Sequence, residues 1–146
     1  MSPNISAADL EALVVQLTSV TTRREGLSRT AAATLSRLAT AGPARLTDLA
    51  AAEEVSQPSM SSMIARLVDQ GLVLREADPD DARAVRLSLT PDGQSLVAER
   101  RSARTRRLNT ALAQLPPGDV AVIADAVPAL TRLADALRRS QKEVSR

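Results

Sequence analysis

The stretch from Val55 to Thr90 constrains the fold of this chain more than any other, because its periodicity changes from helical to alternating within a short span. It opens with Ser56, a residue type that caps helices, and a proline follows in what would be the first turn. Apolar residues then recur at helical spacing until Gly71 ends the pattern. They are Met60, Met63, Ile64 and Leu67. A helix is therefore predicted between Ser56 and Gly71.

Two short strands are predicted after this helix. Residues 72–75 (LVLR) and 85–89 (VRLSL) have the apolar and β-branched composition of strands. The acidic segment between them, residues 78–81 (DPDD), is typical of a turn. Helix, strand, charged turn and strand form the outline of a recognition helix followed by a β-wing.

A further short helix is predicted directly upstream, over residues 46–53, with Thr47 as its cap. Two helices joined across Glu54 and Val55 make a helix-turn-helix, whose second helix enters the major groove of DNA. Glu54 occupies a turn position where glycine is frequent. A positive φ at this position would therefore cost free energy.

The N-terminal third predicts two more helices. Ser6 and Asp9 have the spacing of a capping box, and Ser28 can cap a second helix that ends near residues 41–43. Residues 44–46 can add an edge strand to the wing sheet. The inward face of the second helix carries Leu35 and Leu38, and one face of the first carries Leu10, Leu13, Val14, Leu17 and Thr21.

The C-terminal half predicts two long helices. Thr90 and Pro91 start one that runs to about Gln114, before the sequence Pro-Pro-Gly at 116–118. The last helix has apolar residues at alternating spacings of three and four, a heptad-like seam that requires a partner helix. Pro128 lies inside it and should kink or divide it. The seam consists of Val120, Ile123, Val127, Leu130, Ala134 and Leu137.

The residue types that the chain lacks exclude several functions. With no Cys and no His, a disulfide, a thiol switch and a Cys/His zinc site are excluded, and the usual catalytic base is missing. We therefore expect no enzyme, no metal and no cofactor. A hydrolase that uses carboxylates alone has no supporting spacing. With no aromatic residue, single-stranded nucleic acid cannot be held by base stacking.

Composition indicates an ordinary soluble domain. The 146 residues are 44% apolar, which is enough for one sizeable core. No apolar run approaches the roughly 18 residues of a membrane helix, and the N-terminus lacks the features of a signal peptide. We expect a cytoplasmic protein with no membrane partner. The net charge of +2 does not by itself indicate nucleic acid, so the position of the charges matters.

Four segments together are similar to the MarR family of winged-helix transcription regulators: VSQPSMS, LVDQGLV, DPDDAR and LSLTPDG. The resemblance covers essentially the whole chain. It implies a mainly α fold with a small antiparallel β-wing, in which a winged helix-turn-helix domain is joined to a helical dimerisation region. On this basis residues 6–140 form a single domain. Its parts are the DNA-binding residues 28–90, the linking helix 91–114 and the dimerisation segments 6–25 and 116–140.

The resemblance also implies a homodimer, in which first and last helices of two chains interlock. Helix-turn-helix proteins usually bind DNA as symmetric dimers, which favours the same arrangement. The alternative is that the seam packs only on the first helix of its own chain. The residues expected at the dimer interface are Leu10, Leu13, Leu17, Val120, Ile123, Val127, Leu130 and Leu137.

The recognition helix carries the first set of candidate DNA-binding residues. Gln57 can pair with adenine, and serine hydroxyls can bond bases or phosphates. The alternative is that Ser56 only caps the helix and that the other serines are solvated. Ser62 stands where many similar proteins have Arg, so we expect modest direct readout and much recognition of DNA shape. The candidates are Ser56, Gln57, Pro58, Ser59, Ser61, Ser62 and Arg66.

The wing carries the second set, Asp81, Arg83 and Arg86. By resemblance to the family's Asp-x-Arg motif, Arg83 reaches into the minor groove and Asp81 holds it in place. A narrow minor groove attracts Arg through its negative potential. The alternative is a surface salt bridge worth under about 1 kcal/mol. Asp78 and Asp80 should shape the turn. Arg86, Arg75 and Arg66 are candidates for phosphate contact or internal pairing.

A run of arginines in the long helix has three interpretations. Arg100, Arg101, Arg104, Arg106 and Arg107 form the densest charge in the chain. They can be a solvated face neutralised by acids of the first helix such as Asp9 and Glu11, or contact the DNA backbone. Four of them (Arg100, Arg101, Arg104 and Arg107) can instead bind an anionic effector, which relatives take up between the dimer and DNA-binding regions.

The sequence therefore predicts a DNA-binding transcription regulator of the MarR type. By family analogy it is a homodimeric repressor of pseudo-palindromic double-stranded DNA, released by a small anionic or apolar effector. The alternative is a dimeric winged-helix module that binds protein and not DNA.

Overall fold

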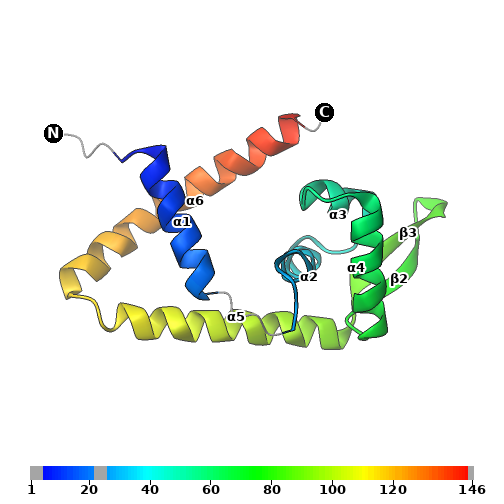
Figure 1. Cartoon of the computed structure of the whole chain (residues 1–146), viewed down its shortest axis with the longest axis horizontal. Coiled ribbons are helices and arrows are strands. Elements are labelled where there is room, and N and C mark those ends of the chain that lie inside the picture. Colours follow the sequence, from blue (N-terminus) through cyan, green and yellow to red (C-terminus); the bar gives the residue numbers. More distant parts are fainter. Residues whose placement is uncertain (1–4, 22–25, 145–146) are drawn as a thin grey trace. The chain divides into compact units, whose positions relative to one another are not determined.

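The structure, a computed structural model, describes residues 5–21 and 26–144, with side chains for residues 5–19, 26–81 and 84–140. The described residues form six helices and a three-stranded antiparallel sheet, which confirms the predicted fold class (Figure 1). The chain divides into two compact units, Met1–Thr105 and Arg106–Arg146. In order, the elements are α1 (Ala7–Thr21), α2 (Arg29–Ala41), β1 (Ala44–Arg45), α3 (Leu46–Ala52), α4 (Gln57–Asp69), β2 (Val73–Asp78), β3 (Asp81–Leu89), α5 (Pro91–Leu112) and α6 (Pro117–Val144).

Most helices of the first unit begin where the sequence predicts, because a side chain accepts a backbone N–H left unbonded by the first turn. Ser28 Oγ accepts from the amide of Ala31 at 3.1 Å. At the start of α1, Ser6 Oγ accepts from the amide of Asp9 at 3.1 Å, and Asp9 Oδ2 accepts from the amide of Ser6 at 3.3 Å. The predicted capping box and the Ser28 cap are confirmed.

The cap of α3 differs from the prediction. The helix begins at Leu46, as predicted, but Thr47 already lies inside it, and Arg45 occupies the cap position without a side-chain hydrogen bond. Arg45 is also the last residue of β1 and pairs with Arg86 of β3. The sheet therefore holds Arg45 extended, and the helix starts as soon as the strand ends.

The strand order is β1-β3-β2, and every pairing is antiparallel. The predicted edge strand at residues 44–46 is confirmed as β1, although Leu46 belongs to α3. The two wing strands are longer than predicted, since β2 runs to Asp78 and β3 begins at Asp81. Only Pro79 and Asp80 separate them. The predicted acidic turn is therefore the tip of a tight hairpin, named the wing below.

The core of the first unit lies between α2, α3, α4 and one face of the sheet. Without aromatic residues it consists of aliphatic and Met side chains. The predicted inward faces of the second helix and the recognition helix are confirmed. In Figure 1, α4 lies between α3 and the β2–β3 hairpin. The largest fully buried residues are Leu35, Leu49, Met60, Ile64, Leu67, Val73, Leu87 and Thr34.

The two helices of the helix-turn-helix end with the same backbone motif but with different residues. After α4, the amide of Leu72 bonds to the carbonyl of Leu67 at 2.9 Å, around Gly71 at φ 71°. After α3, the amide of Val55 bonds to the carbonyl of Ala50 at 3.0 Å, around Glu54 at φ 53°. This is the Schellman arrangement, in which glycine is usual because a side chain is strained at positive φ. Glu54 therefore stores strain in the turn, as its position in the sequence suggested.

We predict that Glu54→Gly stabilises the protein by about 0.5–1 kcal/mol, because relief of the left-handed strain exceeds the added freedom of glycine in the unfolded chain. Urea unfolding followed by circular dichroism measures it. Glu54→Ala is the control, since alanine keeps the Cβ and should give no gain. Equal stabilisation by both variants would show that the carboxylate, and not the backbone, is the source of the cost.

The start of α5 is fixed against the end of the recognition helix. Thr90 Oγ1 accepts from the amide of Gly93 at 2.9 Å, which confirms the predicted cap, and its hydroxyl donates to the carbonyl of Gly71 at 2.6 Å. The amide of Thr90 donates to the carbonyl of Leu72 at 3.1 Å. Gly93 is buried so close to the Leu72 carbonyl that a Cβ would overlap with it.

We expect Gly93→Ala to destabilise the first unit by about 2 kcal/mol or more, because the backbone that it would overlap is tied by hydrogen bonds and cannot move aside. Gly118→Ala is the matched control: Gly118 also lies in the first turn of a helix, but its Cβ would meet nothing within 4 Å. Thermal unfolding of both variants checks the pair. A neutral Gly93→Ala would mean that the α5 start is less tightly fixed than the geometry indicates.

In the second unit, α6 continues through Pro128 as one helix. The prediction that Pro128 divides it is wrong, because the loss of one backbone hydrogen bond does not end a helix of this length. A kink of α6 at Pro128 stays a prediction.

Candidate nucleic-acid interface

The recognition helix α4 presents opposite faces to the core and to solvent. Met60, Met63, Ile64 and Leu67 are at most 6% exposed. The row on the far side of the helix has small or short side chains at spacings of four and three. This row consists of Pro58, Ser62, Ala65 and Asp69, all exposed. The candidate DNA-binding residues Ser56, Gln57, Pro58, Ser59, Ser61, Ser62 and Arg66 are likewise all exposed.

Ser56 and Ser59 bond to each other. Ser56 Oγ accepts from the amide of Ser59 at 3.3 Å and donates to its hydroxyl at 2.8 Å. The interpretation of Ser56 as the helix cap is therefore confirmed. The outward row contains one hydroxyl and no long hydrogen-bond donor, which limits the direct reading of base edges.

The Asp78 carboxylate holds the wing by two hydrogen bonds, of which the sequence predicted only the one within the turn. Asp78 Oδ1 accepts from the amide of Asp80 at 2.9 Å, which confirms its predicted turn-shaping role. Its other oxygen accepts from Arg45 Nε at 2.7 Å, and the side chain is 2% exposed. The Asp80 amide, and next the Arg45 guanidinium, lower the pKa of Asp78 below its ordinary value. Asp78 in turn raises the pKa of Arg45.

Sequence reasoning missed Arg45. Its only signal was the predicted edge strand, which places residue 45 in the wing sheet. Nothing in the spacing shows that a residue 33 positions away along the chain is its partner.

Of the two residues of the wing motif, Asp81 and Arg83, the structure describes only the side chain of Asp81. Asp81 is exposed and is the register partner of Asp78, where the hairpin pairing is irregular. The side chain of Arg83 lies outside the described residues, so the predicted contact between Asp81 and Arg83 stays a prediction.

Arg86 lies at the centre of a charged face of the sheet. Its register partners are Glu76 on β2 and Arg45 on β1, and Ser88 donates to Glu76 Oε2 at 2.8 Å. Arg86 is half-buried, and its charge is one of the causes that lower the pKa of Asp78. For Arg86, phosphate contact and internal pairing both stay predictions.

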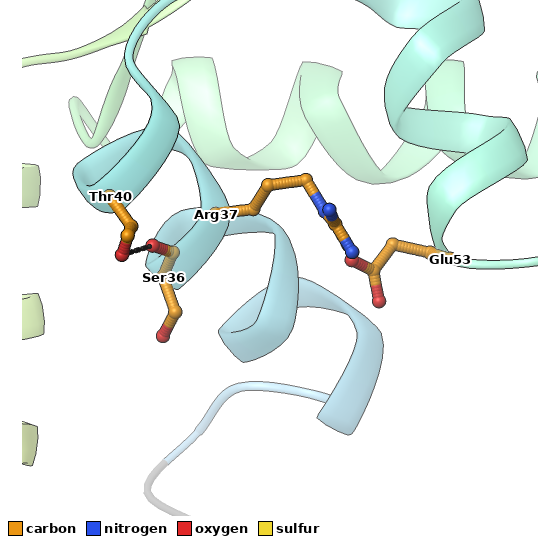
Figure 2. A network of polar contacts seen from close by, with 4 residues as sticks. All are labelled: Ser36, Arg37, Thr40 and Glu53. Atoms are coloured by element: carbon orange, nitrogen blue, oxygen red, sulfur yellow. Dashed lines mark hydrogen bonds and ion pairs between the residues drawn. The ribbon is translucent and has the colours of Figure 1, made fainter. Parts of the chain in front are cut away.

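A second ion pair links α2 to the end of α3, just before the strained Glu54. Figure 2 shows the guanidinium of Arg37 directed at the carboxylate of Glu53, with Nε and Oε1 3.1 Å apart. One turn further along α2, the Thr40 hydroxyl donates to the carbonyl of Ser36 at 2.9 Å. The ion pair is partly exposed, so it contributes under about 1 kcal/mol.

The arginine run spans the boundary between the two units. Arg100, Arg101 and Arg104 belong to the first and Arg107 to the second. Arg100 and Arg107 are half-buried, and the other two are exposed. Asp9, one acid proposed to neutralise the run, accepts a hydrogen bond from the Ser6 hydroxyl at 2.6 Å, which lowers its pKa.

Helices α1 and α6 each expose apolar side chains. Leu10 and Val120 are half-buried. The remaining predicted interface residues are 42–60% exposed, and they are Leu13, Leu17, Ile123, Val127, Leu130 and Leu137. Exposed apolar rows on two helices are the usual mark of an interaction site.

Neither a metal site nor a membrane helix is found in the described part of the chain. No group of three or more acidic, His or Cys side chains lies close enough there to hold a metal ion. None of the helices described is long and apolar enough to cross a bilayer.

Comparison with known proteins identifies the family. A model described as "MarR family" matches residues 27–85, the segment that holds the helix-turn-helix and most of the wing. An HTH-type transcriptional regulator of Mycobacterium tuberculosis is 34% identical over 132 residues, which are 88% of this chain and 92% of the relative. The chain belongs to the MarR family of transcriptional regulators.

Solved structures of MarR regulators have the same fold. A mutant of MarR from E. coli covers 89% of this chain and 99% of its own length, with a TM-score of 0.73 and 19% identity. NadR, solved in complex with 4-hydroxyphenylacetate, covers 89% and 95%, with a TM-score of 0.62 and 23% identity. The winged-helix arrangement found above is thus the one that this family uses.

The lowered pKa of Asp78 predicts a dependence of stability on pH. Because the folded pKa lies below the ordinary value of 3.8, the ionised carboxylate stabilises the fold above that pH, and the contribution disappears as pH falls through the folded pKa. Asp78→Asn should therefore be less stable than the wild type at pH 7, and the difference should shrink below about pH 4. Urea unfolding at both pH values measures it. A difference that persists unchanged in acid would contradict the assignment.

Proposed function

We propose that this MarR-family protein is a homodimeric, sequence-specific DNA-binding repressor of the cytoplasm, without catalytic activity. The observation that carries the proposal is the orientation of α4. Its apolar row is buried against the core, so that the opposite row is exposed over the whole helix, as insertion into the major groove requires.

DNA recognition would combine weak direct contact with base edges and strong dependence on the shape of the DNA. Gln57, Ser61 and Ser62 are the residues of α4 best suited to base edges or phosphates. Their short side chains supply little discrimination, so the deformability and groove width of the DNA carry much of the specificity. Arg83 enters the minor groove from the wing, and Arg66 contacts phosphate.

Dimerisation would join the exposed apolar rows of α1 and α6 to those of a second chain. A symmetric dimer presents two copies of α4 to successive major grooves, so its operator is a pseudo-palindrome. Release by an effector is a change in the spacing of these two helices.

The arginine run and the composition of the chain support a proposal for the class of effector. NadR is a relative in fold that binds 4-hydroxyphenylacetate, a small aromatic acid. In this chain Arg100, Arg101, Arg104 and Arg107 can pair with a carboxylate, whereas the missing aromatic residues leave only aliphatic side chains for the rest of a ligand. We therefore propose a small anionic or apolar molecule.

A winged-helix module that binds protein and not DNA is the second candidate. The short side chains on the outward row of α4 and the net charge of +2 favour it.

Footprinting on the DNA that flanks the gene of this protein distinguishes the two. We expect a protected symmetric site whose affinity falls steeply with salt, because phosphate contacts release counterions. Arg83→Ala should weaken protection by about tenfold or more, corresponding to about 1.4 kcal/mol or more, if its side chain lies in the minor groove. Absence of protection at low salt, by protein shown to be folded, would favour the protein-binding module.

A pair of valines on α6 tests the dimer. Val127 lies in the apolar seam, whereas Val122, five residues earlier, lies about 140° around the helix, and both are exposed. Val127→Glu should give a monomer, because it places a charge in the apolar interface, and Val122→Glu should leave the dimer intact. Sedimentation velocity measures both. A dimer that survives Val127→Glu would place the interface elsewhere.

A further inference from the structure

The ion pair between Arg45 and Asp78 crosses the whole wing sheet. The strand order places β3 between β1 and β2, so the two residues stand on opposite edges of the sheet. Adjacent strands are about 4.8 Å apart, and the two edge strands are therefore roughly 10 Å apart. Only a long side chain can bridge that distance. Arg45 does so, with its Nε 2.7 Å from Asp78 Oδ2.

The pair also ties the tip of the wing to the start of the helix-turn-helix. Arg45 is the last residue of β1 and the cap residue of α3. Asp78 is the last residue of β2, and its second oxygen holds the amide of Asp80 in the turn. The register of the hairpin shifts between Ala77 and Asp78, so regular pairing alone does not hold the tip. The carboxylate thus joins two anchors, one in the turn and one at the start of α3.

Asp78 is an unusual residue for its place. It is one of the few buried charged or polar residues described, and it lies in a hairpin that a regulator would lay against anionic DNA. An acid there cannot contact phosphate, and its 2% exposed side chain faces protein. Burial of a charge is costly unless it is paired and hydrogen-bonded, and both conditions are met here. A role in holding the wing accounts for the acid.

We infer that Arg45 is a positioning residue for DNA recognition: through Asp78 it fixes the wing tip relative to α3, so that the wing residues enter the minor groove in register with α4. The inference rests on the proposed function. A two-stranded hairpin is at most marginally stable by itself in water, so an anchor at its far end orders the segment before DNA binds. Arg45 acts on DNA through the wing and not by its own contact.

Hydrogen exchange measured by mass spectrometry tests the anchor without DNA. In Arg45→Ala, peptides that cover β2 and β3 should exchange several-fold faster, whereas α3 keeps its protection because its start uses no Arg45 side-chain bond. Arg45→Lys should restore most of the protection, since it keeps the charge and nearly the reach. Arg37→Ala is the matched control: it removes another partly exposed arginine of an ion pair in the same unit, but one outside the sheet.

A double-mutant cycle on the footprinted DNA then tests the function. Arg45→Ala should bind about threefold to tenfold more weakly in the wild-type background and no more weakly in the Arg83→Ala background, because both act through the wing. The salt slope should be unchanged, whereas a lost phosphate contact lowers it by about 0.9. Arg37→Ala should show no coupling to Arg83→Ala.

The outcomes separate the inference from the proposed function. If the hydrogen exchange of β2 and β3 is unchanged in folded Arg45→Ala protein, the inference is overturned, whatever the affinity of this variant for DNA. Additive losses with a reduced salt slope also overturn it, since Arg45 would then be a phosphate contact. If no DNA is protected by the wild type, the proposed function fails and the exchange measurement alone decides whether the anchor exists.

Discussion

The burial of one apolar row of α4 is the constraint on which the rest of the DNA-binding unit depends. Met60, Ile64 and Leu67 pack on aliphatic residues of α2, α3 and the sheet, in a core that contains no aromatic ring. Since a helix has a fixed angular relation between its faces, this burial alone turns the row from Pro58 to Asp69 outward. This orientation exposes the residues of α4 that the proposed function assigns to DNA.

Around this core, polar contacts set the positions that packing leaves open. The Arg45–Asp78 pair spans the sheet, the Arg37–Glu53 pair joins α2 to α3, and Thr90 attaches α5 to the end of α4. An exposed ion pair contributes little to stability, but each of these contacts fixes the position of one element relative to its neighbour. The strain at Glu54 lies in the turn between α3 and α4. It is tolerated because the buried residues of these two helices fix the backbone on both sides.

Local features of the fold could mostly be predicted from the sequence, whereas most side-chain contacts between distant segments could not. Caps at Ser28, Ser56 and Thr90 were predicted because each depends on residues three positions away. The cap at Thr47 was wrong because strand pairing of Arg45, a tertiary contact, overrode the local preference. The same limit applies to Asp78. Its hydrogen bond within the turn could be predicted from the sequence, whereas its ion pair with Arg45 could not. For the candidate site, the exposure of the α4 residues followed from helical spacing, whereas the surroundings of Arg86 required the strand order.

The stoichiometry of the protein–DNA complex is the most direct test of the proposal that two chains bind one symmetric site. Because the protein lacks Trp and Tyr, absorbance near 280 nm in a sedimentation experiment reports the DNA almost alone, and interference optics report protein and DNA together, so that the protein is obtained by difference. We expect two chains on a duplex that contains the full footprinted site, and much weaker binding to a duplex that contains only one half-site. One chain per duplex, bound equally well to a half-site, would contradict it.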